Sequence, residues 1–195
     1  MINICIILMT HNKKSDINYI KLFKNSFKRI KNVQLFFIKW NNKNLINFII
    51  KKKIKGIILS GSKYRILKSK NANISTNIFK LKIPILGICY GYQWLITKLG
   101  NKNYINSHLD EKNHTYYKYL KINKPFKIKK KKYFLNHFDY IKKIPSNWFS
   151  VIKYKNQILM SYDDVNKYIG IQFHPEKNKN TGYIFYKKWI KYIIS

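Results

Sequence analysis

The stretch Pro84-Ile85-Leu86-Gly87-Ile88-Cys89-Tyr90-Gly91-Tyr92-Gln93 joins an apolar run to a cysteine between two glycines. A buried strand that enters such a turn and then a helix forms a nucleophile elbow, because the tight turn needs glycine on either side of the reactive residue. The turn places the Cys89 sulfur at a helix N-terminus, where the dipole favours the thiolate. The stretch therefore predicts a strand, a tight turn and a helix, with Cys89 as candidate nucleophile. A packed cysteine without a chemical role is the alternative.

The residues before this stretch alternate between strand-like and helix-like segments, which is typical of a parallel sheet covered by helices. Ser15 is expected to cap the first helix, whose apolar residues recur at three- and four-residue steps. The expected strands are residues 2–9, 33–38, 56–59 and 83–88. The expected helices are residues 15–30, 45–50, a short segment near Ile78, and 91–99.

The second half of the chain has short β-rich runs separated by turn residues, which predicts antiparallel additions to the sheet. These runs are residues 117–122, 133–135, 150–154, 158–162 and 169–173, followed by an amphipathic helix at 181–194. The lysine-rich residues 127–132 are expected to form a charged loop or hairpin connection. We therefore predict a single α/β domain over residues 1–195, with an open, mostly parallel sheet flanked by helices.

A second segment, Gln172-Phe173-His174-Pro175-Glu176, ends an apolar run with a histidine and a glutamate. A cysteine nucleophile needs a base that takes its proton and returns it to the leaving group, and the base needs a carboxylate to orient its ring. His174 and Glu176 supply both groups. Because the chain has only seven acidic residues, a carboxylate at this position is notable, and a merely packed histidine is the weaker interpretation.

Together these segments resemble the class I, triad-type glutamine amidotransferases. The family's motif Gly-x-Cys-x-Gly-x-Gln is matched by residues 87–93, and its motif Gln-Phe-His-Pro-Glu by residues 172–176. Ser60-Gly61-Ser62, after the third expected strand, is similar to the family's oxyanion loop. The resemblance covers nearly the whole chain and implies a flavodoxin-like fold, in which strand ends place the site.

The resemblance implies hydrolysis of the side-chain amide of glutamine to glutamate and ammonia. Cys89 would attack the amide carbon, His174 would protonate the departing ammonia and activate water, and Glu176 would orient His174. Backbone N–H groups at Tyr90 and near Gly61 would hold the oxyanion. Gln93 is implied to contact the substrate amide, and a buried glutamine that bonds the helix terminus is its alternative.

One position departs from the family pattern. The oxyanion loop of the family usually has two glycines and then proline, whereas Gly61 is followed here by Ser62-Lys63-Tyr64-Arg65. If the missing glycine needs a positive φ, Ser62 would carry backbone strain and misplace the oxyanion donor. An impaired or partner-activated glutaminase is therefore one expectation.

Residues 133–141 resemble the Ser-His-Gly-Asp segment of GMP synthetase amidotransferase domains, with Asn136 in place of Ser and Phe138 in place of Gly. By this resemblance Asn136 and His137 would line the glutamine pocket. Asp139 would either dock a partner or cap a loop.

The chain has no Gly-rich phosphate loop or nucleotide-activating motif, so no cofactor is expected. The ammonia acceptor is therefore expected on a separate synthase chain, with a GMP-synthetase-like partner as the first candidate. A stand-alone γ-glutamyl hydrolase and a catalytically silent binding protein are the alternatives.

The chain is strongly basic: 40 Lys and Arg residues against seven Asp and Glu residues give a formal net charge of +33. Such a charge is typical of proteins that bind nucleic acid or anionic membranes. Only Arg29 and Arg65 are arginines, although nucleic-acid readers favour arginine for bidentate contacts. Lys, Asn, Ile and Tyr make up more than half of the chain, as an A+T-rich coding sequence produces. We therefore expect a solvated lysine surface without specific nucleic-acid binding.

Cys5 and Cys89 are too few for a disulfide framework and suggest no metal cluster, so a reducing compartment such as the cytoplasm is expected. The N-terminal apolar run is too short to span a membrane and lacks the basic leader of a signal peptide. No membrane association is expected.

Overall fold

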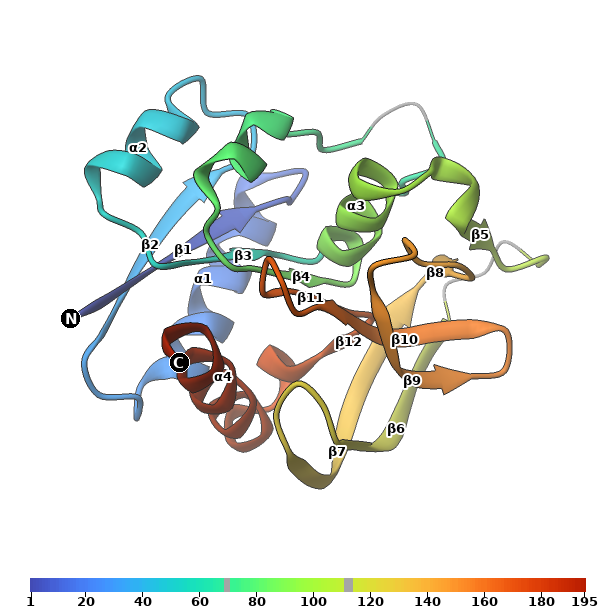
Figure 1. Cartoon of the computed structure of the whole chain (residues 1–195). Coiled ribbons are helices and arrows are strands. Elements are labelled where there is room, and N and C mark those ends of the chain that lie inside the picture. The colour runs from blue at the N-terminus through green and yellow to red at the C-terminus, as the bar shows by residue number, and fades with distance from the viewer. Residues whose placement is uncertain (69–70, 111–113) are drawn as a thin grey trace.

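The computed structural model describes residues 1–68, 71–110 and 114–195 and contains a central seven-stranded sheet (Figure 1). Its strands are, in spatial order, β2 (Val33–Lys39), β1 (Ile2–Leu8), β3 (Gly56–Leu59), β4 (Ile85–Ile88), β11 (Tyr168–Ile171), β10 (Gln157–Asp163) and β9 (Phe149–Tyr154). The five strands β2, β1, β3, β4 and β11 are parallel to one another. The strand β10 is antiparallel to both of its neighbours, β11 and β9. The predicted α/β class with antiparallel additions is confirmed.

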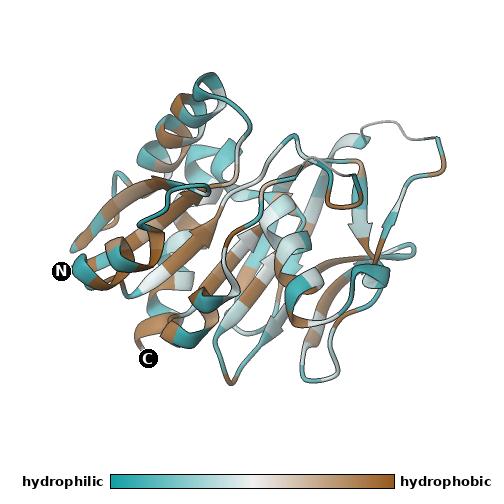
Figure 2. Ribbon diagram, turned by 90° about the horizontal axis from the view of Figure 1, so that it is seen from above, coloured by the Kyte–Doolittle hydropathy of each residue, from teal (hydrophilic) through white to brown (hydrophobic). Residues whose placement is uncertain are grey.

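Helices cover both faces of this sheet, and alternate side chains of β1 pack into the hydrophobic cluster on each face. Ile4 and Ile6 belong to one hydrophobic cluster, whereas Cys5 and Ile7 belong to the other, because successive strand residues point to opposite faces. The first cluster includes residues of α1 (Lys13–Phe27) and α4 (Lys179–Ile194). The second includes residues of α2 (Leu45–Lys51), the 3₁₀ segment η1 (Thr76–Leu81) and α3 (Tyr90–Leu99). Figure 2 shows the apolar strands enclosed between these layers.

The prediction of antiparallel additions to the central sheet is confirmed for residues 150–154 and 158–162, which form β9 and β10. It is wrong for the other β-rich runs: β11 joins the central sheet parallel to β4, and the remaining strands lie outside that sheet. Three of the strands, β6 (His114–Ile122), β7 (Ile128–His137) and β12 (Phe173–His174), form a separate three-stranded sheet. Two more, β5 (Ile105–Ser107) and β8 (Asp139–Ile141), pair with each other. The break at Gln172, which separates β11 from β12, transfers the chain from one sheet to the other and so carries His174 away from the central sheet.

The lysine-rich run predicted as a loop or hairpin connection lies largely within β7. Its backbone is paired with β6, while Lys130 and Lys132 extend into solvent and Ile128 and Tyr133 are buried. A strand with one solvated face accommodates lysines without loss of ladder hydrogen bonds. A run of identical lysines conceals the two-residue period by which such a strand is recognised.

Several element ends also differ from the predictions. Asn12, rather than Ser15, caps α1, because its side chain accepts a hydrogen bond from the Ser15 backbone N–H at 2.9 Å. The fourth strand begins at Ile85, and the helix after it begins at Tyr90. Two 3₁₀ turns, η2 (Lys102–Tyr104) and η3 (Pro175–Lys177), complete the fold. None of the helices in the described ranges is long and apolar enough to cross a membrane.

Candidate active site

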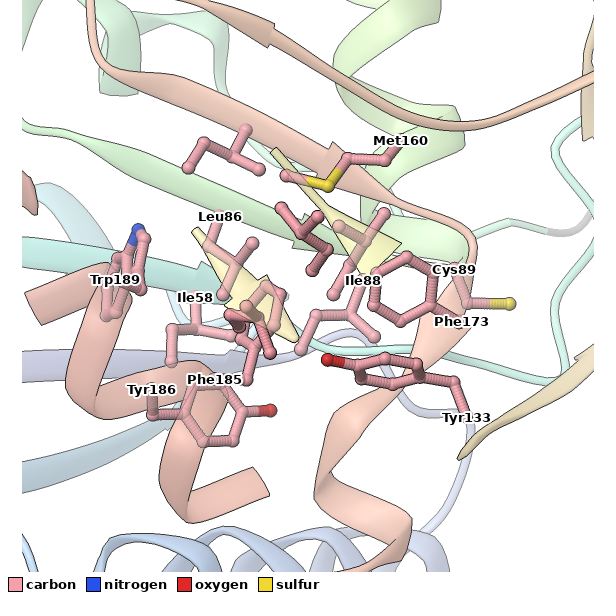
Figure 3. Close-up of a cluster of buried hydrophobic side chains, with 14 of the residues drawn as sticks. Ile58, Leu86, Ile88, Cys89, Tyr133, Met160, Phe173, Phe185, Tyr186 and Trp189 are labelled. Carbon is pink, nitrogen blue, oxygen red and sulfur yellow. The ribbon is translucent and has the colours of Figure 1, made fainter. Parts of the chain in front are cut away.

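Cys89 lies in the tight turn between β4 and α3, as the sequence predicts. Its φ of 51° and ψ of −104° are outside the favoured regions for a side-chain-bearing residue. The two glycines that flank it have no space for a side chain. A Cβ on Gly87 would lie 2.7 Å from the Gly91 carbonyl carbon, and a Cβ on Gly91 would meet the Leu59 backbone. The turn therefore presents the sulfur at the edge of the core, directed away from the packed rings (Figure 3).

His174, the last residue of β12, and Glu176, in η3, form a buried pair. The His174 Nδ1 lies 2.7 Å from Glu176 Oε1, and the Tyr186 hydroxyl donates to Glu176 Oε2 at 3.5 Å. Burial opposes a charged imidazole, but Glu176 and Cys89 outweigh it and raise the pKa of His174. His174 is therefore disposed to hold a proton beside the cysteine. This is the arrangement required of a base oriented by a carboxylate.

Cys89 and His174 share one cavity of about 420 Å³, a size that suits a small metabolite. Of the other predicted site residues, those that line it are Tyr90, Gln93, Asn136 and His137. Glu176 lies behind His174. Gly61 lies at the cavity wall, since a Cβ on it would lie 2.8 Å from His174 Cε1. The fold thus brings all eight predicted site residues to one place.

The wall formed by β7 and β8 is polar and incompletely satisfied. Asp139 Oδ1 accepts hydrogen bonds from Arg65 and from the Ser107 hydroxyl, whereas Asp139 Oδ2 is buried without a partner among the described residues. The same holds for both ring nitrogens of His137. Burial and the neighbouring His108 lower the pKa of His137 to about 3, so this ring is neutral. Such unsatisfied buried groups are costly unless a ligand completes them.

Gln93 and Asn136 contact this part of the site in different ways. The side-chain nitrogen of Gln93 donates to the Asp139 carbonyl at 2.7 Å and to Gln172 Oε1 at 3.3 Å, so it is bonded to the protein. The backbone carbonyl of Asn136 lies 3.6 Å from the Cys89 sulfur, and Gln172 donates to that sulfur at 3.3 Å. The backbone of β7 thus approaches the candidate nucleophile directly.

The sequence model of the glutamine amidotransferase class-I family matches residues 16–190. The chain belongs to this family.

Curated relatives of this amidotransferase include GMP synthases. The glutamine-hydrolysing GMP synthase of Wigglesworthia glossinidia brevipalpis is 33% identical over 157 residues, which are 74% of this chain and 30% of the relative. The GMP synthase of Borreliella burgdorferi (strain N40) is 35% identical over 130 residues, which are 63% of this chain and 24% of the relative. The chain therefore spans less than a third of the length of these relatives.

Solved structures share the fold at lower identity. PurLQS from Thermotoga maritima superposes with a TM-score of 0.63 at 16% identity, covering 99% of this chain and 97% of that one. The glutaminase domain of Trypanosoma brucei CTPS, with bound acivicin, gives a TM-score of 0.66 at 10% identity, covering 98% and 94%. These likenesses confirm the fold.

The strain anticipated at Ser62 of this amidotransferase is not present. Ser62 does not have a positive φ; of the described site residues, Cys89 is the one that does. The Ser62 hydroxyl instead accepts a hydrogen bond from the Tyr64 backbone N–H at 3.1 Å. The serine is therefore accommodated within the turn that follows Gly61.

Two residues at the site of the amidotransferase were assigned no role from the sequence. Arg65 pairs with the buried Asp139, which excludes the docking role considered for that aspartate, since Asp139 is only 2% exposed. The sequence did contain one signal for Arg65, since it is one of only two arginines beside 38 lysines. A guanidinium group suits a multidentate contact with a carboxylate, so such an arginine indicates a specific ion pair. Tyr19, on α1, also lines the cavity, and no motif marked it.

In the part of the chain that the structure describes, no group of three or more His, Cys, Asp or Glu side chains is placed to hold a metal ion.

Proposed function

We propose that residues 1–195 form one amidotransferase domain that hydrolyses the side-chain amide of glutamine and passes the ammonia to a separate synthase chain. The observation that carries this proposal is the convergence of Cys89, in its strained turn, with the buried His174–Glu176 pair on one cavity. Family membership supports the same reaction. Because the reaction needs Cys89 as a free thiol, a reducing compartment such as the cytoplasm suits it.

The first half of the reaction transfers the glutamyl group to Cys89. The sulfur attacks the amide carbon while its proton resides on His174, and the carbonyl electrons move to oxygen. Backbone N–H groups of Gly61 and of Tyr90, the first residue of α3, stabilise this oxyanion, each contributing about 3 kcal/mol in comparable reactions. The intermediate collapses with cleavage of the C–N bond, and His174 gives its proton to the departing ammonia.

The second half releases glutamate. His174 takes a proton from water, the resulting hydroxide attacks the thioester carbon, and the Cys89 thiolate leaves. Glu176 keeps the ring oriented through both halves by accepting from Nδ1. The raised pKa of His174 supports this role, because the imidazolium that forms beside Cys89 is stabilised by Glu176.

The polar wall of the cavity supports an amino acid as substrate. The α-ammonium group of glutamine would donate a hydrogen bond to Asp139 Oδ2, which is buried and has no partner among the described residues. Asn136 and His137 lie beside it on β7 and close the pocket around the glutamine chain. Gln93 supports the wall through its bond to the Asp139 carbonyl.

We expect low glutaminase activity from the isolated chain and a rise of at least about tenfold when a GMP-type synthase chain and its nucleotide substrate are added. Ammonia is wasted unless an acceptor is ready, and a displacement of about 1 Å at a catalytic group can cost 100-fold in rate. A partner that shifts the loop containing Gly61 and Ser62 would act as the switch. Ammonia release is measured for the chain alone, with synthase, and with synthase plus nucleotide.

Each other outcome of these three assays has a definite meaning. Full activity of the isolated chain indicates a stand-alone γ-glutamyl hydrolase. No activity under any condition, with several synthases tried, indicates a silent binding protein. Stimulation by a different synthase retains the amidotransferase and excludes only the GMP-type partner.

The large positive charge gives a separate prediction. If it reflects composition rather than function, binding to duplex DNA or RNA is weak, independent of sequence, and lost near physiological salt, because diffuse lysine contacts are displaced by counterions. Fluorescence anisotropy with two unrelated duplexes over a salt series measures this. A preference between the duplexes that persists at about 0.2 M salt would contradict it.

A further inference from the structure

Tyr19 places a hydroxyl group at the reacting centre that the mechanism above does not use. The residue lies on α1 and lines the cavity that contains Cys89 and His174. The position that a Cβ on Gly61 would occupy is 2.5 Å from the Tyr19 hydroxyl oxygen and 2.8 Å from His174 Cε1. The hydroxyl therefore lies against both the oxyanion loop and the ring of the base.

The ring of Tyr19 is held in place by the core. It stacks on Phe23, which is completely buried, with ring centroids 6.2 Å apart and planes at 28°. Phe23 in turn contacts Tyr186, whose hydroxyl donates to Glu176. One end of this aromatic series thus supports the carboxylate of the His174–Glu176 pair, and the other end presents the Tyr19 hydroxyl.

The Tyr19 hydroxyl is available as a donor. Within the described residues it has no hydrogen-bond partner, although it faces the cavity. Burial, Glu176 and Cys89 together raise the pKa of Tyr19 well above its ordinary value, so the group keeps its proton near neutral pH. A neutral hydroxyl beside a developing negative charge stabilises that charge by donating a hydrogen bond.

We propose that the Tyr19 hydroxyl is a third oxyanion donor, in addition to the backbone N–H groups of Gly61 and Tyr90. The proposal rests on the glutaminase function proposed above. When Cys89 adds to the amide carbon, the new C–S bond transfers the carbonyl electron pair to oxygen, and Tyr19 donates to that oxygen without losing its proton. Tyr19 would add this donor at a loop in which Ser62 stands in place of the family's second glycine. The Ser62 hydroxyl already accepts a hydrogen bond from the Tyr64 backbone N–H.

The test is the variant Tyr19→Phe, which keeps the stacked ring and removes only the hydroxyl. We expect kcat for glutamine hydrolysis to fall about 100-fold, as for removal of one oxyanion donor, with KM changed less than about threefold. Alkylation of Cys89 by iodoacetamide, which forms no oxyanion, should proceed at the wild-type rate. The matched control, Tyr183→Phe, removes a hydroxyl that Lys187 contacts on α4, outside the cavity, and should retain kcat.

Hydroxylamine separates the two halves of the reaction. An oxyanion donor acts in both tetrahedral intermediates, so glutamyl hydroxamate formation and hydrolysis should fall together in Tyr19→Phe. Loss of hydrolysis alone would show that Tyr19 positions water instead, and would overturn the proposal. So would a kcat equal to that of the wild type, or a matching loss of iodoacetamide reactivity. A wild-type chain that neither hydrolyses glutamine nor reacts at Cys89 with a glutamine analogue would overturn the proposed function as well.

Discussion

Replacement of Cys89 by alanine abolishes glutamine hydrolysis, with an expected loss of at least about 1,000-fold, because no other group can form the glutamyl thioester. An electrophilic analogue of glutamine should label Cys89 and leave Cys5 unmodified. Cys5 lies in β1, completely buried, and burial raises the pKa of its thiol to about 12. Cys89 lines the cavity, and its sulfur points away from the packed core (Figure 3). Peptide mass mapping of the labelled chain distinguishes the two sites.

The matched control is Cys5→Ala, which removes the other thiol and should keep both the label and the activity. The assignment fails if the label is found on Cys5, or if Cys89→Ala retains turnover. It also fails if no label appears while a competent synthase is present.

His174→Ala should lower turnover to a similar extent, by about 1,000-fold, because this ring both takes the sulfur proton and protonates ammonia. His11→Ala, His108→Ala and His114→Ala should lower it far less. His11 is the most demanding of these controls, since it lines the same cavity but contacts the Asn12 amide and, within the described residues, no carboxylate comparable to Glu176. Steady-state rates of ammonia release for the four variants decide the matter. A comparable loss in any control would show that the base is assigned to the wrong histidine.

Most of the first half of the fold could be predicted because three of its four strands, β1, β3 and β4, are largely buried on both faces, whereas β2 lies at the sheet edge and is half-buried. Strands buried on both faces appear in the sequence as continuous apolar runs, and residues 56–59 were delimited correctly from that signal. The second half contains strands with one solvated face, where the pattern must alternate. The lysines of β7 fill both kinds of position in the sequence and hide that alternation. Which sheet a strand joins depends on contacts distant in sequence, and local patterns do not contain them.

The candidate catalytic residues could be predicted because each belongs to a short motif. His174 and Glu176 are two residues apart, and Cys89 is marked by its flanking glycines, so neither assignment depends on the tertiary structure. Tyr19 and Arg65 belong to no motif. Tyr19 reaches the cavity because of the rotation of α1 about its axis, and Arg65 because a loop crosses to β8. These features are set by packing, which the sequence pattern does not specify.

The tight contacts of Gly87 and Gly91 bear on the history of the sequence. Glycine codons are rich in guanine, so a genome drifting toward adenine and thymine tends to lose them wherever another residue is tolerated. The chain retains seven glycines, and at each of them a Cβ would come within 3.0 Å of another atom. At Gly87 and Gly91 the nearest atoms belong to the backbone, so these two positions have no free volume for a larger residue. In a chain whose composition leaves few glycines, the two that flank Cys89 are therefore sterically required, and they fix the turn that presents the sulfur.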